Sequence, residues 1–207
     1  MVSSWNFSRL DEADKKPVNL HEGIDSTLLI LQNRWKATSL RSGIQIIKEY
    51  GDLPEVECYA GKLNQVFMNI ISNAIDALEE GVNNSVPLIA SSGTEEGFIG
   101  KGQLPSPITP DLSPVIRIRT TILDSNLVEI RITDNGSGMT EEVQSKIFDP
   151  FFTTKPVGQG TGLGLSISYQ IVVEKHGGQL QCISAPGKGA EFVITIPQRQ
   201  TSAPRQK

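Results

Sequence analysis

The chain has 207 residues, which suits one compact domain with some loops and is short for two full domains. A hydrophobic fraction of 38% and a charged fraction of 20% exclude wholesale disorder and a collagen-like or membrane composition. The formal charge of -4 argues against duplex nucleic acid as the main partner. Anionic small molecules remain possible where a cation accompanies them.

Cysteine usage and the N-terminal segment predict the compartment. Cys58 and Cys182 are too few and too far apart for a disulfide framework or a zinc site, and they suit a reducing environment as small buried side chains. No apolar run approaches the length of about 18 residues that a membrane-spanning helix needs. Residues 1–16 lack the apolar core of a signal peptide. We therefore expect a cytoplasmic chain without membrane contact of its own.

The first half of the chain predicts two helices separated by short strands. After a polar, loosely held segment, Asn19 and Glu22 resemble a capping box for a helix over about 19–37. Two short strands are expected around Ile44–Ile46 and 55–59, on either side of the turn at 51–54. The strongest helical period covers 62–80 and is expected to end at Gly81.

The second half predicts an insertion, a hairpin, two helices and two further strands. Residues 81–114 are rich in Gly, Ser and Pro and are interpreted as an insertion within one domain. The elements expected after it are a hairpin of 115–122 with 127–134, a short helix near 141–148, a helix over 163–176 and strands at 179–184 and 190–196. The predicted fold class is an α/β two-layer sandwich, with a mixed, mostly antiparallel sheet covered on one face by helices. The predicted domain spans 19–197, between a stub at 1–18 and a disordered tail at 198–207.

The helix over 62–80 has a polar stripe of unusual composition. Asn69, Asn73 and Asp76 share one face, whereas solvated helix faces usually carry Lys and Glu. Asn is a poor helix former, so two of them four residues apart ask for a reason. The stripe is either merely solvated or supplies an amide oxygen to a hard cation such as Mg²⁺.

Asp134 ends a strand on the same parity as its apolar positions, which aims the carboxylate at the covered face. A buried carboxylate needs donors, and an adenine exocyclic amine would supply one. The alternative is a strand-end Asp that begins the turn at Asn135 and Gly136. Gly136 and Gly138 would then permit positive φ and a close approach to a flat ligand.

A glycine-rich loop precedes the helix over 163–176. Gly158, Gly160, Gly162 and Gly164 run into the first turn, where free N–H groups favour phosphate. The loop is neither a Walker A motif nor a clean dinucleotide fingerprint. Upstream, Phe148, Phe151 and Phe152 are expected to anchor a lid over about 151–161, in which Lys155 offers a cation to phosphate.

These motifs together resemble the N, G1, F and G2 boxes and the final glycine box of sensor histidine kinases. The matching segments begin at Gln65, Asp134, Phe148, Gly160 and Gly187, in that order. The resemblance implies the catalytic, Bergerat-type ATP-binding fold shared with gyrase, Hsp90 and MutL ATPases. It implies Asn73 as a Mg²⁺ ligand. The implied ATP-binding residues are Asn69, Asn73, Asp76, Asp134, Gly136, Gly138, Met139, Phe148, Lys155, Gly160, Thr161, Gly162, Leu163 and Gly164.

Two departures limit what the resemblance implies. Ala190 follows the final glycine box, where relatives often carry Ser or Thr. His21-Glu22 lacks the phosphoacceptor context and opens a helix, whose N-terminus opposes imidazolium formation. We therefore assign no catalytic residue and expect a dimerisation domain carrying the acceptor His, and a response-regulator receiver domain, as partners. A nucleotide-binding module without transferase activity and a gyrase, Hsp90 or MutL-type ATPase stay open as alternatives.

Overall fold

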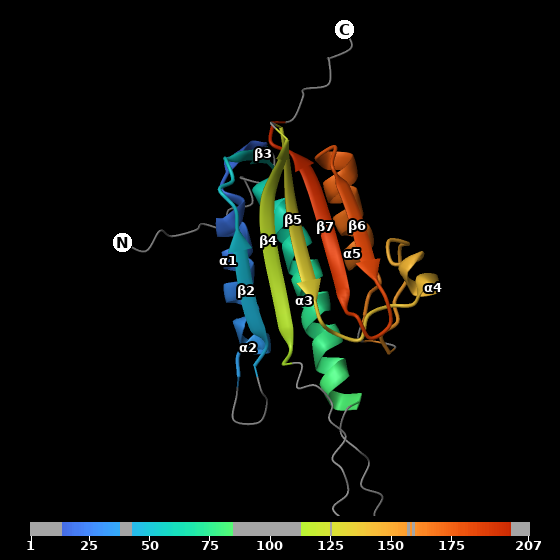
Figure 1. Ribbon diagram of the computed structural model, residues 1–207. Coiled ribbons are helices and arrows are strands. Elements are labelled where there is room, and N and C mark those ends of the chain that lie inside the picture. The colour runs from blue at the N-terminus through green and yellow to red at the C-terminus, as the bar shows by residue number, and fades with distance from the viewer. Residues whose placement is uncertain are drawn as a thin grey trace, which may run out of the picture.

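A computed structural model describes residues 14–37, 43–84, 113–124, 126–156, 158 and 160–199. Within them, a five-stranded sheet in the order β2-β4-β5-β7-β6 carries helices on one face (Figure 1). Its strands are β2 (Gln45–Tyr50), β4 (Val115–Asp124), β5 (Leu127–Asp134), β6 (Gln179–Ser184) and β7 (Ala190–Pro197). The helices are α1 (Leu20–Ile30), α2 (Gln32–Trp35), α3 (Ala60–Asn84), α4 (Glu141–Gln144), α5 (Gly164–Tyr169) and the π-helix η1 (Gln170–Lys175). The predicted two-layer α/β sandwich is confirmed.

Strand pairing gives the mixed, mostly antiparallel sheet that the sequence predicts. β2 pairs with β4 in parallel, and the other neighbours are antiparallel. The predicted hairpin is present as β4 and β5, with Ile118 opposite Ile132. Along β5, Val128, Ile130 and Ile132 are buried in the core beneath the helices, as the alternation requires.

The long helix α3 lies across the centre of the covered face. Leu63, Phe67, Ile70 and Ile71 are fully or almost fully buried, so the apolar stripe of the sequence faces the sheet. The prediction that Gly81 ends this helix is wrong, because α3 continues through it to Asn84. A glycine inside a helix costs only about 1 kcal/mol, which neighbouring turns can offset.

The N-terminal region differs from the prediction in its strand pairing. The strands on either side of the turn at 51–54 belong to different sheets, since β3 (Val56–Cys58) pairs with β1 (Lys16–Val18). β1 was not predicted, and it lies inside the segment expected to be loosely held. Asn19 does cap α1, but its side chain accepts from the N–H of His21. The predicted helix is broken at Leu31 into α1 and α2.

The last helix changes its winding halfway. The predicted helix over 163–176 begins as α5 and continues as the π-helix η1. His176 follows it, fully buried, and its ring joins η1 to the start of α3. Its Nε2 accepts from the N–H of Tyr59 at 3.1 Å, so Nδ1 carries the proton that is donated to the Ile171 carbonyl at 2.7 Å.

The chain after β7 contacts two other segments. Gln198, in the predicted tail, donates its N–H to the Asn126 carbonyl and accepts from the N–H of Glu57. Residues 85–112 of the predicted insertion at 81–114 and residues 200–207 of the predicted tail lie outside the described residues. Among the residues that the structure describes, no helix has both the length and the apolar character needed to cross a bilayer.

Candidate functional site

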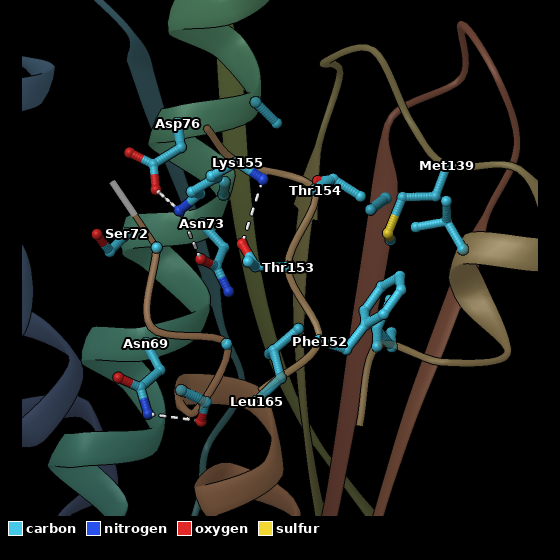
Figure 2. Close-up of a pocket in the computed structure, with 18 of the residues that line it drawn as sticks. Asn69, Ser72, Asn73, Asp76, Met139, Phe152, Thr153, Thr154, Lys155 and Leu165 are labelled. Carbon is cyan, nitrogen blue, oxygen red and sulfur yellow. Dashed lines mark hydrogen bonds and ion pairs between the residues drawn. The ribbon is translucent and has the colours of Figure 1, made fainter. Parts of the chain in front are cut away.

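A cavity of about 400 Å³ lies between α3, the end of β5, the start of α5 and the loop before α5 (Figure 2). It brings together residues that are far apart in the sequence. The predicted site residues that line it are Asn69, Asn73, Asp76, Asp134, Gly138, Met139, Lys155, Gly160, Thr161, Gly162 and Gly164. Lining residues that the sequence analysis missed include Ser72, Ala77, Glu80, Val143, Ile147, Thr153, Thr154, Leu165 and Phe192.

Three predicted site residues do not line the cavity. Gly136 lies behind Asp134, where its N–H donates to Oδ1 of that carboxylate at 2.9 Å. Phe148 packs on the core, and its ring lies 5.4 Å from that of Tyr169. Leu163 is the residue before α5 and accepts the hydroxyl hydrogen bond of Ser166. Each of the three is adjacent in the sequence to a residue that lines the cavity.

Asp134 is a buried carboxylate with one oxygen satisfied by the protein. The side chain belongs to a residue only 5% exposed, and Oδ1 accepts from the N–H groups of Gly136 and Ala190. Burial raises the pKa of Asp134, and the two N–H groups lower it. Among the described residues, none donates a hydrogen bond to Oδ2. An unpaired oxygen at the wall of a cavity is suited to a ligand that brings its own N–H donor.

Glycine backbones shape the loop after Asp134. Gly138 has φ +66°, as predicted, and a Cβ there would collide with the backbone oxygen of Ala185. Gly189, on the turn between β6 and β7, has φ +72° and would collide with the Asp134 carbonyl. The prediction of positive φ at Gly136 is wrong; a Cβ there would instead lie 3.1 Å from Ala77 of α3. Only glycine allows these backbones to approach so closely.

The two asparagines of α3 face the opposite part of the cavity. Asn69 donates from Nδ2 to the Gly164 carbonyl at 2.8 Å and to the Ser168 hydroxyl at 3.1 Å, which joins α3 to the first turn of α5. Asn73 lies one turn further along α3, and its Oδ1 is 3.4 Å from the ammonium of Lys155. The stripe is therefore not merely solvated.

The loop that carries Lys155 closes over this part of the cavity. We call residues 151–161 the lid segment; 157 and 159 are outside the described residues. Its base is pinned where the Phe151 N–H donates to the Gly162 carbonyl at 2.9 Å. Phe152 is partly buried against the core, but Phe151 is 74% exposed with φ +67°, so its predicted anchoring role is wrong. Gly162 lies so close to Phe151 that a Cβ would collide with it.

Both histidines have structural partners away from the cavity. The His21 ring stacks on Tyr50 with centroids 4.2 Å apart, and Nε2 lies 2.8 Å from the Thr120 hydroxyl. Burial lowers the pKa of His21, and the neighbouring Asp25 raises it. The ring of His176 contacts the Ile171 carbonyl of η1 through Nδ1. Neither ring lines the cavity.

The site thus combines helices on one face of a mixed sheet with a cavity walled by amides, glycines and one buried carboxylate. The model of the family described as "Histidine kinase-, DNA gyrase B-, and HSP90-like ATPase" matches residues 59–200. The chain belongs to this family, and it carries the ATP-binding module found in sensor histidine kinases.

Individual relatives agree with that assignment. Sporulation kinase E of Bacillus subtilis (strain 168) is 35% identical over 155 residues, covering 75% of this chain and 16% of the relative. Signal transduction histidine-protein kinase AtoS of Escherichia coli (strain K12) is 30% identical over 192 residues, covering 92% and 25%. A nucleotide-free catalytic domain of histidine kinase ThkA has a TM-score of 0.61 at 26% identity, covering 89% of this chain and 96% of that one. The chain thus spans about a sixth to a quarter of the length of these curated relatives.

Proposed function

We propose that this chain is the Mg-ATP-binding catalytic domain of a two-component sensor histidine kinase. In this proposal, the domain transfers the γ-phosphoryl group of ATP to a His on a dimerisation domain, for relay to an Asp of a response-regulator receiver domain. The observation that carries the proposal is Asp134, a buried residue that lines the cavity and whose Oδ2 lacks a donor among the described residues. The exocyclic amine of adenine would supply that donor.

The remaining lining residues divide between the base and the phosphates. Met139, Ile147 and Phe192 line the same cavity as Asp134 and provide apolar contacts for a flat ring. At the other end, the N–H groups of the first turn of α5 and the ammonium of Lys155 suit phosphate. This half includes Asn69, Gly160, Thr161, Gly162 and Gly164.

Mg²⁺ fits the residues present when most of its ligands come from phosphate and water. The oxygens of Asn73 and Asp76 already converge on a cation, the Lys155 ammonium. The described residues contain no group of three or more His, Cys, Asp or Glu that could hold a metal alone, and in this proposal the nucleotide supplies further ligands. Asn73 would hold the ion, which when bound neutralises phosphate charge.

Asn69 favours a kinase over a hydrolytic ATPase. The relatives that hydrolyse ATP are expected to carry a Glu at this place to activate water, and an amide cannot accept a proton at neutral pH. Here the Asn69 amide is instead used to join α3 to α5. The chain then contributes positioning and charge neutralisation, while the acceptor imidazole and its base come from the dimerisation domain.

The proposal includes an organisation and a location for the chain. The ATP-binding domain would span 19–197, with 81–114 as an insertion and the stub at 1–18 as a link to the dimerisation domain. The role requires ATP and a response regulator, so we place the domain in the cytoplasm. No contact of this chain with nucleic acid or membrane is needed.

Phosphotransfer in trans tests the proposal. The chain alone, incubated with labelled ATP, should neither label itself nor release phosphate steadily, because the loss of a positioned base costs about 10²- to 10⁴-fold in rate. A histidine kinase with a disabled ATP site but an intact acceptor His should acquire acid-labile label when this chain is added. Asp134→Ala should abolish that transfer.

Three results would contradict the proposal. Acid-labile label on the isolated chain that disappears in His21→Ala would make His21 the acceptor. Steady phosphate release that collapses in Asn69→Ala would make the chain an ATPase. ATP binding without transfer to any tested acceptor domain would favour a regulatory nucleotide-binding module.

A further inference from the structure

An ion cluster joins the lid segment to α3 and α2 at the wall of the cavity. Figure 2 shows the part of it between Lys155 of the lid segment and Asp76 of α3. The Lys155 ammonium forms an ion pair with Oδ2 of Asp76 and lies 3.4 Å from Oδ1 of Asn73. The side chains of Lys155 and Asp76 are 28% and 24% exposed. The lid is therefore turned toward α3, with its cation between two oxygens of that helix.

The same carboxylate has a second cation as partner. Arg34 of α2 forms an ion pair with Oδ1 of Asp76, and it also contacts Glu79 at 2.7 Å and the Ser72 hydroxyl at 2.9 Å. These three partners follow one face of α3 at helical spacing, so Arg34 is held by several contacts at once. Asp76 is thus shared between a cation fixed on α2 and a cation on the lid.

An acidic side chain at this place conflicts with a polyphosphate ligand. Asp76 lines the cavity in which the proposed function puts the phosphates. Its charge is offset by Arg34 and Lys155, but once Lys155 turns to phosphate, one of these two cations is lost. Phosphate would then face a carboxylate that repels it, unless another cation enters between them.

We propose that Asp76 is the positioning residue for the lid. It holds the Lys155 ammonium beside Asn73 while nucleotide is absent. When metal-bound nucleotide arrives, the oxygens of Asp76 and Asn73 contact the divalent cation in place of Lys155. Lys155 and the metal ion compete for the same place, so Asp76 makes the site select metal-bound nucleotide over free nucleotide. The inference rests on the proposed function for its ligand, but not for the contact in the ligand-free chain.

Hydrogen exchange of the ligand-free chain tests the contact. Asp76→Asn keeps the size of the side chain but removes its charge, and should speed amide exchange at 152–156 about two- to five-fold, as expected for a partly exposed ion pair. Lys155→Met should do the same, and the double variant should exchange no faster than either. Glu79→Gln is the matched control, because it removes an acidic partner of Arg34 from the next turn of α3.

Nucleotide affinity tests the consequence. For Asp76→Asn, we expect free ATP in EDTA to bind about two- to five-fold more tightly than to the parent chain, because neither an ion pair nor a like charge opposes it. The affinity of Asp76→Asn for Mg-ATP should equal that of the parent chain. The ratio of the affinity for Mg-ATP to the affinity for free ATP should therefore fall. Glu79→Gln should leave that ratio close to the parent value.

Several outcomes would overturn the inference. Equal effects of Asp76→Asn and Glu79→Gln would mean that Asp76 acts through Arg34 alone. Unchanged lid exchange, or an effect of Asp76→Asn that persists in the Lys155→Met background, would mean that the ion pair does not hold the lid. If Asp76→Asn fails to fold, Lys155→Met alone must still speed lid exchange. A chain that binds no ATP would refute the proposed function and leave the exchange result standing.

Discussion

The end of the cavity at Asp134 and the end at Lys155 differ in what holds them in place. The Asp134 end is held by backbone contacts. The N–H groups of Gly136 and Ala190 bind the carboxylate, and Gly138 and Gly189 pack against other backbone segments. The Lys155 end is held by partly exposed side chains, which form ion pairs from the lid to α3 and from α2 to α3.

This difference separates the end that is fixed before a ligand binds from the end that can rearrange when it binds. Backbone contacts of glycine have no rotamers to change, so the Asp134 end is already arranged before a ligand binds. Ion pairs between partly exposed side chains are individually weak and can exchange partners. In the proposed function, the Asp134 end would therefore choose the base, and the lid end would sense the phosphates and their cation.

The largest effect should come from adding a methyl group at the rigid end. Gly138→Ala combines positive φ with a collision against Ala185, and we expect a loss of about 3 kcal/mol in the free energy of unfolding. Gly158→Ala also has positive φ but meets nothing within 4 Å, so it should cost only about 1–2 kcal/mol. Urea unfolding of both variants measures this; equal losses would remove the contrast between the two ends.

Removing the carboxylate should weaken binding of the base. Asp134→Ala should cost about 1.5–3 kcal/mol of ATP binding, the value of a hydrogen bond to a charged group. ADP should lose the same amount, since the base is common to both nucleotides. Calorimetric titration measures both affinities. Unchanged affinity in a folded variant would show that Asp134 does not hold the base.

The two ends of the last helix extend the comparison. Its first turn faces the lid, whereas His176 fixes its last turn through a fully buried ring. Burial lowers the pKa of His176 below 6.5, so the unfolded chain binds a proton that the folded ring does not. Stability is thus complete above pH 6.5 and falls as the pH drops toward the folded pKa, by up to about 1.4 kcal/mol per pH unit.

Two variants separate the histidine contributions. Burial lowers the pKa of His21 as well, so it should act in the same direction, although His21 is less buried than His176. Thermal unfolding between pH 7 and 5.5 should lose more of its slope in His176→Gln than in His21→Gln. A slope that both variants leave intact would place the titrating group elsewhere.

The smallest effect concerns the lid. A non-hydrolysable ATP analogue with Mg²⁺ should slow amide exchange at 151–156 more than ADP does, because only the former offers a γ-phosphate to Lys155. The difference should be about two- to five-fold, in keeping with partly exposed contacts. Hydrogen exchange followed by mass spectrometry measures it. Equal protection by both nucleotides would mean that the lid does not sense the γ-phosphate.

Local periodicity was sufficient for the elements whose partners lie nearby or on the opposite layer. The hairpin of β4 and β5, the apolar face of α3 and the inward direction of Asp134 all follow from spacing alone. Local sequence could not give the parallel pairing of Gln45 with Val115, because 70 positions separate them. It also missed β1, which is only three residues long and gains its stability from β3.

In the site too, contacts between residues far apart in the sequence could not be predicted. Asn69, Asn73 and Lys155 could be singled out from composition and motif, but the contact of Lys155 with Asp76 depends on how the lid folds back. Arg34 carried no local signal, since a charged residue on a four-residue helix is ordinary. Phe151 looked like an anchor because apolar residues usually are, whereas its positive φ turns the side chain outward.

Because η1 is wound as a π-helix, the residues that follow it point in other directions around the helix axis than they would after an α-helix. Successive residues of an α-helix turn by about 100°, so a single extra residue taken up by wider winding redirects every later residue of the helix. The residue redirected here is His176, placed between Ile171 and Tyr59. Deleting one residue from 170–175 would restore regular winding while leaving the first turn of α5 where it is. The number of residues in this short stretch therefore sets the side of the helix on which His176 lies, and with it the contact of the ring with Tyr59.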